Sequence, residues 1–196
     1  MTSQLRLSTN VHRTGPTGGI ELNMLQITRE LVKRGHRVDL IYGEAGSFVP
    51  EYERLCASAT RVPSVDYLYP GGRRGKARQA IGMLPAIFEA IRHRPDVIYG
   101  NRVFSNGWAI PAGLLSSSPV VCHLHGHSEL DGSQMAWLNR HVGRFVVSSR
   151  FVEDRWHRSG LDPAKSEVLY NGIDPAGYPP GGIHERTMAR RALGLP

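Results

Sequence analysis

The sequence predicts an α/β fold, a Rossmann-like and mostly parallel sheet with helices on both faces. Short β-rich runs alternate with amphipathic helical runs along the chain, which is the pattern of successive βαβ units. Turn-forming residues separate these runs. The chain is 40% hydrophobic and 21% charged, an ordinary globular balance that allows a sizeable core.

The first βαβ unit is the easiest to delimit. Residues 5–9 form a candidate first strand, and the turn-rich segment 13–19 follows it. A helix then begins near residue 20, because apolar residues recur there at helical spacing: Ile20, Met24, Ile27 and Leu31. Gly35 ends this helix, and residues 37–42 form the second strand.

The remaining elements follow the same alternation. Pro85 lies inside the helical run 76–92 and predicts either a kink or two shorter helices. Ser148 or Ser149 is expected to cap the helix over 151–158. The other expected elements are strands over 59–62, 96–99, 120–124, 145–148 and 166–169, and a helix over 106–115.

We expect one domain over residues 1–174. Residues 175–182 are rich in proline and glycine and have the composition of a linker. A helical run over 184–193 follows. We therefore interpret residues 175–196 as a linker and the start of a truncated second domain.

The formal net charge is +7, and part of the excess is concentrated in residues 73–78 and 92–94. Such a charge suits an anionic partner, or is simply a solvated basic helix face. The basic segment precedes the apolar set Ile81, Leu84 and Phe88. That helix could lie on an anionic bilayer, but we expect its apolar stripe to pack on the sheet.

Several classes of protein are disfavoured. The sequence has no aromatic-interleaved basic stripe, helix-turn-helix cue or zinc spacing, so no nucleic-acid partner is predicted. Its two cysteines, Cys56 and Cys122, are expected to be free thiols. No apolar run approaches the ~18 residues that span a bilayer, and no signal peptide is visible. We expect a soluble, cytoplasmic protein, with peripheral contact at the inner face of the membrane as a further expectation.

Four stretches in this order resemble glycosyltransferase family 4. They are Gly18-Gly19-Ile20-Glu21 with residues 31–38, the run 95–99, the run 119–126, and Val147-Ser148 with residues 168–174. The resemblance covers residues 5–174. It implies the N-terminal, acceptor-side half of a two-domain GT-B fold, a retaining transfer of sugar from a nucleotide-sugar donor to a hydroxyl acceptor (glycan, lipid or small molecule), and no metal or other cofactor.

Gly18 and Gly19 are the predicted donor-binding residues. They precede a helix, so free backbone N–H groups and the positive end of the helix dipole suit a diphosphate. The alternative is a loop that requires positive φ. The pattern is not Gly-x-Gly-x-x-Gly, which disfavours a dinucleotide site. Glu21 either faces the acceptor or stabilises the first helical turn.

His125 is the predicted catalytic residue, because it follows a strand at its carboxyl end, where open α/β sheets place ligands. The resemblance implies that it orients the transferred sugar rather than acting as a base. His123 and His127 share its face at period two, so a metallohydrolase remains an alternative. We nevertheless assign no metal ligand and expect His123 to be structural.

Asn101, Arg102 and Ser149 are the other predicted acceptor-binding residues, with Glu21. Arg102 could clamp an anionic acceptor, and Ser149 could equally serve only as a helix cap. Residues 48–55 and 67–74 are interpreted as acceptor-specific loops. Asn171 and Asp174 are interpreted as turn and hinge residues.

The sequence therefore predicts a glycosyltransferase acceptor-side domain that is inactive on its own. Two alternatives stay open. One is a non-enzymatic module that binds a glycan or partners a separate donor domain, and the other is the histidine-rich metallohydrolase.

Overall fold

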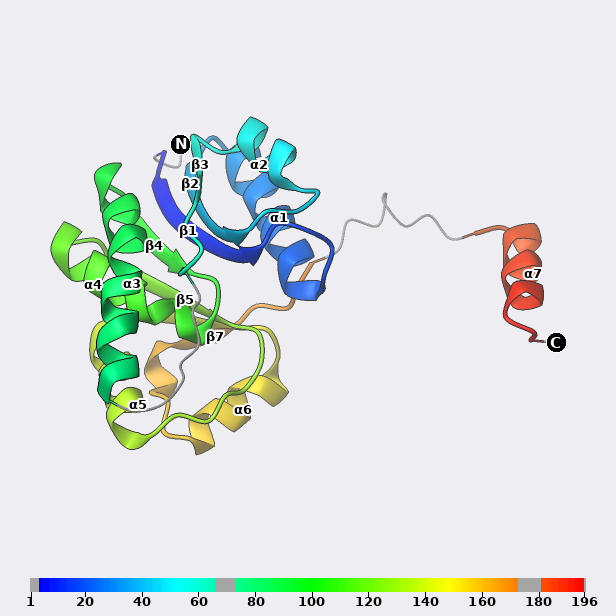
Figure 1. The fold of residues 1–196 in the computed structure, drawn as a ribbon. Helices are drawn as coiled ribbons and strands as arrows, with labels where there is room; N and C mark the ends of the chain where they lie inside the picture. Colours follow the sequence, from blue (N-terminus) through cyan, green and yellow to red (C-terminus); the bar gives the residue numbers. More distant parts are fainter. Residues whose placement is uncertain (1–3, 66–72, 173–180, 196) are drawn as a thin grey trace.

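A computed structural model of the chain describes residues 4–65, 73–172 and 181–195, and for residues 73–80 the backbone alone. Within these ranges the strands are β1 (Arg6–Arg13), β2 (Arg37–Glu44), β3 (Ser58–Arg61), β4 (Val97–Gly100), β5 (Val120–Leu124), β6 (Arg144–Val147) and β7 (Ser166–Val168). They form one parallel sheet in the order β3-β2-β1-β4-β5-β6-β7 (Figure 1). The predicted fold class is confirmed.

The helices of the described part are α1 (Gly19–Lys33), α2 (Val49–Leu55), α3 (Arg73–Arg92), α4 (Asn106–Ser116), α5 (Gly132–His141), α6 (Arg150–Arg158) and α7 (Ile183–Ala192), with short 3-10 turns η1 (Val103–Ser105) and η2 (Pro163–Lys165). None of them is long and apolar enough to cross a membrane. Most predicted elements are confirmed to within two residues. The first two strands run further than expected, because β1 and β2 stay paired as far as Arg13 and Glu44.

Helix α1 buries a different face from the one its apolar spacing suggested. Met24 is fully buried, but Glu21 and Thr28 share its face and are buried too. Thr28 satisfies its hydroxyl by donating to the Met24 carbonyl at 2.8 Å. The helix ends as predicted at Gly35, whose φ of +86° is a left-handed conformation that glycine adopts without strain.

Two helices correct the sequence prediction. Residues 48–55, expected as a loop, contain α2, which is held because Tyr52 is fully buried against the core. Helix α5 was not predicted at all. Its start is fixed by a capping box, in which Asp131 accepts from the Gln134 backbone N–H at 2.9 Å and the Gln134 side chain accepts from the Asp131 N–H at 2.9 Å.

Helix α3 bears on two further expectations. It is one helix with Pro85 inside it, which excludes the alternative of two shorter helices. Pro85 is exposed, so the carbonyl that loses its intrahelical donor lies on the solvent side, where water can satisfy it. The stripe of Ile81, Leu84 and Phe88 does not pack on the sheet, since these side chains are 67%, 57% and 67% exposed. Small residues of the opposite side, Ala86 and Ala90, are buried instead.

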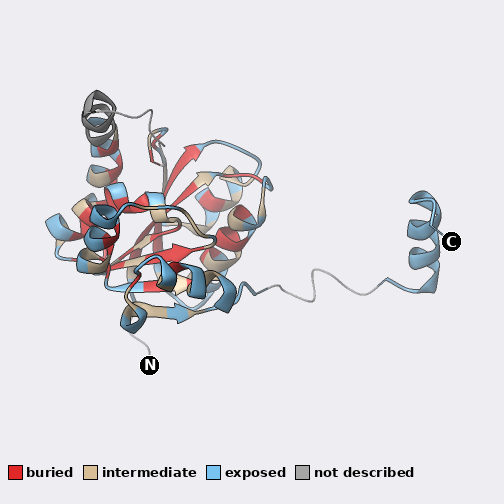
Figure 2. Cartoon of the chain, turned by 90° about the horizontal axis from the view of Figure 1, so that it is seen from below, coloured by how far each residue is buried: buried red, intermediate tan, exposed pale blue. Residues whose placement is uncertain are grey.

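The sheet separates two cores, and successive residues of β2 point to opposite sides of it. Leu40 and Tyr42 pack in a cluster with α1 and α2, whereas Ile41 belongs to the larger cluster with α3 and α4. Figure 2 shows the buried strands in the middle, with the exposed sides of the helices around them. The larger cluster also holds the fully buried Trp108 and Trp156.

The strand order changes direction between β1 and β4. The chain proceeds from β1 outward to β2 and β3, then returns to the other side of β1 with β4 and continues outward to β7. In open parallel sheets, ligands bind outside the carboxyl ends of the strands at such a switch point. The fold therefore indicates the ends of β1, β4 and β5 as the place to look for a site.

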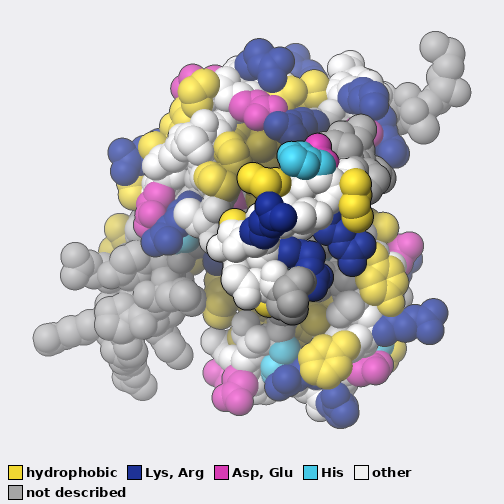
Figure 3. Space-filling view, turned by 90° about the vertical axis from the view of Figure 1, so that its right-hand side faces the viewer, with side chains coloured by type: hydrophobic (Ala, Val, Ile, Leu, Met, Phe, Trp, Pro, Cys, Tyr) yellow, Lys and Arg dark blue, Asp and Glu magenta, His cyan; other side chains and the backbone are white. Residues whose placement is uncertain are grey.

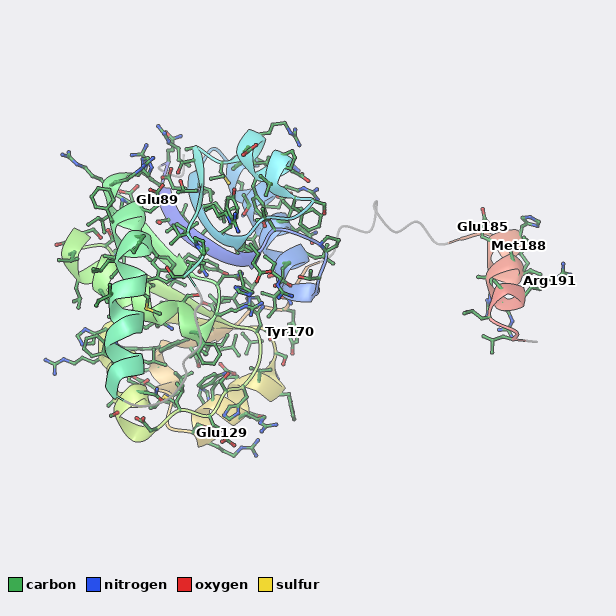
Figure 4. All side chains as sticks on the ribbon, viewed as in Figure 1. Glu89, Glu129, Tyr170, Glu185, Met188 and Arg191 are labelled. Atoms are coloured by element: carbon green, nitrogen blue, oxygen red, sulfur yellow. The ribbon has the colours of Figure 1, made fainter. Side chains whose placement is uncertain are left out.

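The predicted linker, residues 175–182, lies mostly outside the described residues, as does Asp174. Helix α7 follows it, and none of its residues is buried. Figure 4 shows Glu185, Met188 and Arg191 on this helix, and Tyr170 just after β7. Tyr170 and Asn171 are exposed.

Candidate active site

Two buried asparagines and a partly buried histidine meet at the switch point. Asn10 lies on β1, Asn101 directly follows β4, and His125 directly follows β5. His125 Nε2 lies 3.0 Å from Asn101 Oδ1, and the Asn101 backbone N–H donates to Asn10 Oδ1 at 3.1 Å. Asn10 and Asn101 are 0% and 1% exposed. The predicted residues His125 and Asn101 are therefore in direct contact.

His123 supports His125 from beneath. The two rings stack with centroids 3.8 Å apart and an interplanar angle of 30°. His123 Nδ1 lies 2.6 Å from the Tyr99 hydroxyl. Burial raises the pKa of Tyr99, so the hydroxyl keeps its proton and stays neutral. The fully buried His123 thus has the structural role that was expected of it.

Both imidazoles are neutral near pH 7. Burial lowers the pKa of His123 to about 4. Burial, then the neighbouring His123 and the Arg102 guanidinium, together lower the pKa of His125 to about 3, against a hydrogen bond with Asn101 that raises it. A ring with so low a pKa is a weak base, which fits an orienting rather than a proton-accepting role.

The backbone at His125 is held from the neighbouring strand and helix. The Ser148 hydroxyl donates to the His125 carbonyl at 3.0 Å, and Trp156 Nε1–H donates to the Gly126 carbonyl at 2.9 Å. Because Trp156 is fully buried, the turn after β5 is fixed to the core. The candidate site rests on a rigid edge of the sheet.

The two glycines at the start of α1 are not explained by backbone conformation. Gly18 is extended, with φ of −172°, and neither glycine has positive φ. No side chain caps this helix. A Cβ on Gly19 would have no heavy atom within 4 Å, and one on Gly18 would lie 3.0 Å from Glu21 Oε2. The alternative of a loop that requires positive φ is therefore excluded, and an open helix N-terminus remains.

Glu21 and Arg102 form an ion pair beside these glycines. Arg102 Nη2 donates to Glu21 Oε1 at 2.8 Å, and the two side chains are 30% and 7% exposed. The pair joins the start of α1 to the end of β4. Glu21 is thus committed to Arg102, while the more exposed guanidinium remains accessible to an anionic ligand.

Ser149 caps α6, with its hydroxyl accepting from the Val152 N–H at 3.3 Å. This confirms the predicted cap. No hydrogen bond joins Ser149 to the other predicted site residues in the part of the chain that the structure describes.

His127 is separate from the stacked pair. Its Nε2 lies 2.8 Å from the Ser159 hydroxyl, and its ring packs 5.0 Å from that of Trp156. The three histidines therefore do not converge on one point. Among residues 4–65, 81–172 and 181–195, no group of three or more His, Cys, Asp or Glu side chains is arranged to hold a metal ion.

A hollow of about 320 Å³ lies on the surface of α6, and His127 is one of its lining residues. Its other lining residues are Phe151, Arg155, Arg158 and Ser159. The Arg155 guanidinium lies 5.9 Å above the Phe151 ring. Neither arginine forms an ion pair with another described residue. Figure 3 shows Lys and Arg side chains spread among hydrophobic ones on one face of the molecule.

Sequence reasoning missed several of these residues. Asn10 could have been found as the polar residue near the end of the first strand, and Tyr99 as the polar end of a buried strand. Phe151, Arg155 and Ser159 recur at helical spacing on α6, which was the signal for the hollow.

The fold and the site together define a class of protein. A parallel sheet with an uncapped glycine-rich helix start and polar groups at its switch point is typical of α/β domains that bind a ligand at the carboxyl edge of the sheet. The model of Glycosyltransferase Family 4 matches residues 17–176. The chain belongs to this family.

Two curated relatives have the same name, D-inositol 3-phosphate glycosyltransferase. The protein from Acidothermus cellulolyticus is 25% identical, with 93% of this chain and 45% of the relative aligned. The protein from Geodermatophilus obscurus is 23% identical, with 92% and 44% aligned. The chain spans less than half the length of these relatives.

Solved structures share the fold. A glycosyltransferase from Rickettsia africae superimposes with a TM-score of 0.74 and 16% identity over 100% of this chain and 51% of that one. Anabaena Alr3699/HepE, solved in complex with UDP and glucose, gives a TM-score of 0.70 and 18% identity over 97% and 50%. Both matches cover about half of the longer protein.

Proposed function

We propose that the complete protein transfers a sugar from a nucleotide donor to a hydroxyl acceptor, and that this chain supplies its acceptor-side domain. The observation that carries the proposal is a neutral His125 at the switch point, held by Asn101, whose neighbour Arg102 reaches the open start of α1 through its ion pair with Glu21. Membership of Glycosyltransferase Family 4 favours this function over a glycan-binding module or a metallohydrolase.

The donor diphosphate is proposed to lie at Gly18 and Gly19. Free N–H groups and the helix dipole attract a phosphate there, and the missing Cβ of Gly19 lets it approach the backbone. The complex of Anabaena Alr3699/HepE with UDP and glucose supports a donor of this chemistry. Residues 175–196 would lead into the half that holds the rest of the donor, so the isolated chain should show no turnover.

Gly19→Ala tests the donor site in the polypeptide as encoded, with whatever follows Pro196. A methyl group there meets no atom of the chain, so folding should be unaffected. The added methyl group should hold the phosphate away from the backbone N–H groups, and the resulting loss of about one charge-assisted hydrogen bond should weaken UDP-glucose binding about 10- to 100-fold. Gly132→Ala is the matched control, since Gly132 also begins a helix and also has open space around its Cβ position.

Equal UDP-glucose affinity of Gly19→Ala and the parent, measured by calorimetry, would refute this placement. Failure of the parent protein to bind or turn over any nucleotide sugar would refute the function itself.

Retention of anomeric configuration is proposed as well. His125 is too weak a base to deprotonate an acceptor at neutral pH, and Glu21 is held by Arg102. The leaving phosphate of the donor would then receive the proton of the acceptor hydroxyl. These residues would need no metal ion for that step. An inverted product, identified by NMR, would contradict retention. Loss of activity in EDTA would contradict the metal-free reaction.

The acceptor is proposed to carry a phosphate or carboxylate. Arg102 and the α6 hollow with Arg155 and Arg158 offer guanidinium groups for it. The two relatives are named for an inositol phosphate acceptor, which supports this class. Substituting alanine at Arg158 should raise the KM for such an acceptor about tenfold. Arg37→Ala, exposed at the start of β2, should not.

We also propose a cytoplasmic protein that contacts the membrane at its inner face through α3. The exposed Ile81, Leu84 and Phe88 lie on the helix that begins with the basic segment 73–78. Phe88→Ser should reduce co-sedimentation with phosphatidylglycerol vesicles several-fold. Leu115→Ser, equally exposed on α4, is the control. Equal loss in both variants, or no binding by the parent protein, would contradict this surface.

A further inference from the structure

Hydrogen bonds at the switch point connect three strands through His125, Asn101 and Asn10. We infer that Asn101 is a positioning residue, whose side-chain oxygen holds His125 as the Nε2–H tautomer. Asn10 in turn fixes Asn101. This assigns Asn101 a role other than the acceptor contact predicted from the sequence.

The two ring nitrogens of His125 have different surroundings. Nε2 lies 3.0 Å from Asn101 Oδ1, a carbonyl oxygen that can only accept. Nδ1 is buried and has no partner among the described residues. A proton on Nδ1 would be a buried donor without an acceptor, and Nε2 would lose its hydrogen bond. A proton on Nε2 satisfies Asn101 and leaves only an unpaired acceptor, which costs less.

Asn101 can do this because its own position is fixed. It is 1% exposed, and its backbone N–H donates to Asn10 Oδ1 at 3.1 Å across the gap between β4 and β1. The His125 carbonyl is held separately by Ser148. Both ends of the hydrogen bond from His125 to Asn101 are therefore anchored to the sheet, and the ring has one orientation.

The stacked His123 completes the arrangement. Its Nδ1 lies 2.6 Å from the Tyr99 hydroxyl, which ties the His123 ring to β4. Two neutral rings can stack at 3.8 Å, whereas protonation of either would bring a positive charge against the other ring and near Arg102. The low pKa of His125 agrees with a ring that stays neutral in its fixed tautomer from pH 5 to 8.

The consequence for the reaction rests on the proposed function. A fixed neutral ring presents the same surface to the sugar in every turnover. Removing the Asn101 oxygen should release the ring, so Asn101→Ala should lower kcat about tenfold or more in the polypeptide as encoded. If Asn101 contacted the acceptor, the substitution would instead raise the KM for the acceptor. We expect that KM to change less than about threefold.

The decisive measurement uses this chain and needs no substrate. Long-range ¹H–¹⁵N NMR of the histidine rings reports which nitrogen carries the proton. We expect Nε2–H for His125 in the parent chain at pH 7. Asn101→Asp should keep that tautomer, because a carboxylate oxygen still accepts, and should raise the His125 pKa. Asn101→Ala should give a mixture of tautomers.

Asn106→Ala is the matched control, a buried asparagine near β5 that bonds the Val103 carbonyl and Cys122 but no histidine. It should leave the His125 tautomer unchanged. An Nδ1–H signal in the parent chain, or an unchanged tautomer in folded Asn101→Ala, would overturn the inference. Because the spectra do not depend on donor binding, a failed transferase assay would refute the proposed function and leave this result standing.

Discussion

Acid should destabilise this domain through its two stacked histidines. His123 is fully buried and His125 is partly buried, and both are neutral in the folded chain. In the unfolded chain each would titrate near its ordinary pKa of 6.5. As the pH falls below that value, the unfolded chain takes up protons that the folded chain does not, so folding stability decreases.

The magnitude follows from His123. Its pKa falls from 6.5 to about 4 on folding, with burial as the cause. At about 1.4 kcal/mol for each pH unit, the contribution is about 3 kcal/mol. It is fully present above pH 6.5 and is lost between pH 6.5 and about 4. His125 should add a loss of similar size that continues to about pH 3. These losses are large for a domain, since the free energy of unfolding is typically about 5–15 kcal/mol.

Urea unfolding at pH 7, 6, 5 and 4 tests this, with His123→Asn as the comparison. The asparagine side chain can bond the Tyr99 hydroxyl in place of Nδ1, with its oxygen accepting or its NH2 group donating, but it does not titrate. The difference in unfolding free energy between parent and variant should shift by about 3 kcal/mol against the parent from pH 7 to pH 4. A difference constant within about 0.5 kcal/mol would refute the assignment of a buried neutral His123.

Two further comparisons between variants separate packing from charge. A Cβ on Gly113 would lie 2.5 Å from Val120 Cγ2, so Gly113→Ala should cost about 1–3 kcal/mol in urea unfolding. Gly107→Ala on the same helix meets only the flexible end of a methionine side chain and should change stability by less than about 1 kcal/mol; equal costs would contradict this reasoning. Arg102→Ala leaves Glu21 buried without its cation and should cost about 2 kcal/mol, most of which Glu21→Gln should recover in the double variant.

The sequence alone determined the fold class, most of the strand and helix boundaries, and the neighbourhood of the site. Periodicity identified the βαβ order because each strand and helix must bury one apolar side against its neighbours. The position of His125 after a strand was also sufficient to predict where in the fold it lies, since parallel strands place their carboxyl ends at one edge of the sheet. The order of the four family-like motifs along the chain was enough to predict the family.

Only the tertiary structure decided which side chains touch. Asn10 and Asn101 are 91 residues apart, and their contact arises because β4 returns beside β1. The exposure of Phe88 and the burial of Glu21 depended on how each helix is rotated against its neighbours, which apolar spacing does not fix. The separation of His127 from the stacked histidines depended on Trp156 and Ser159, which belong to a helix packed against a different strand. Long-range packing sets these contacts, whereas local spacing sets only the elements that carry them.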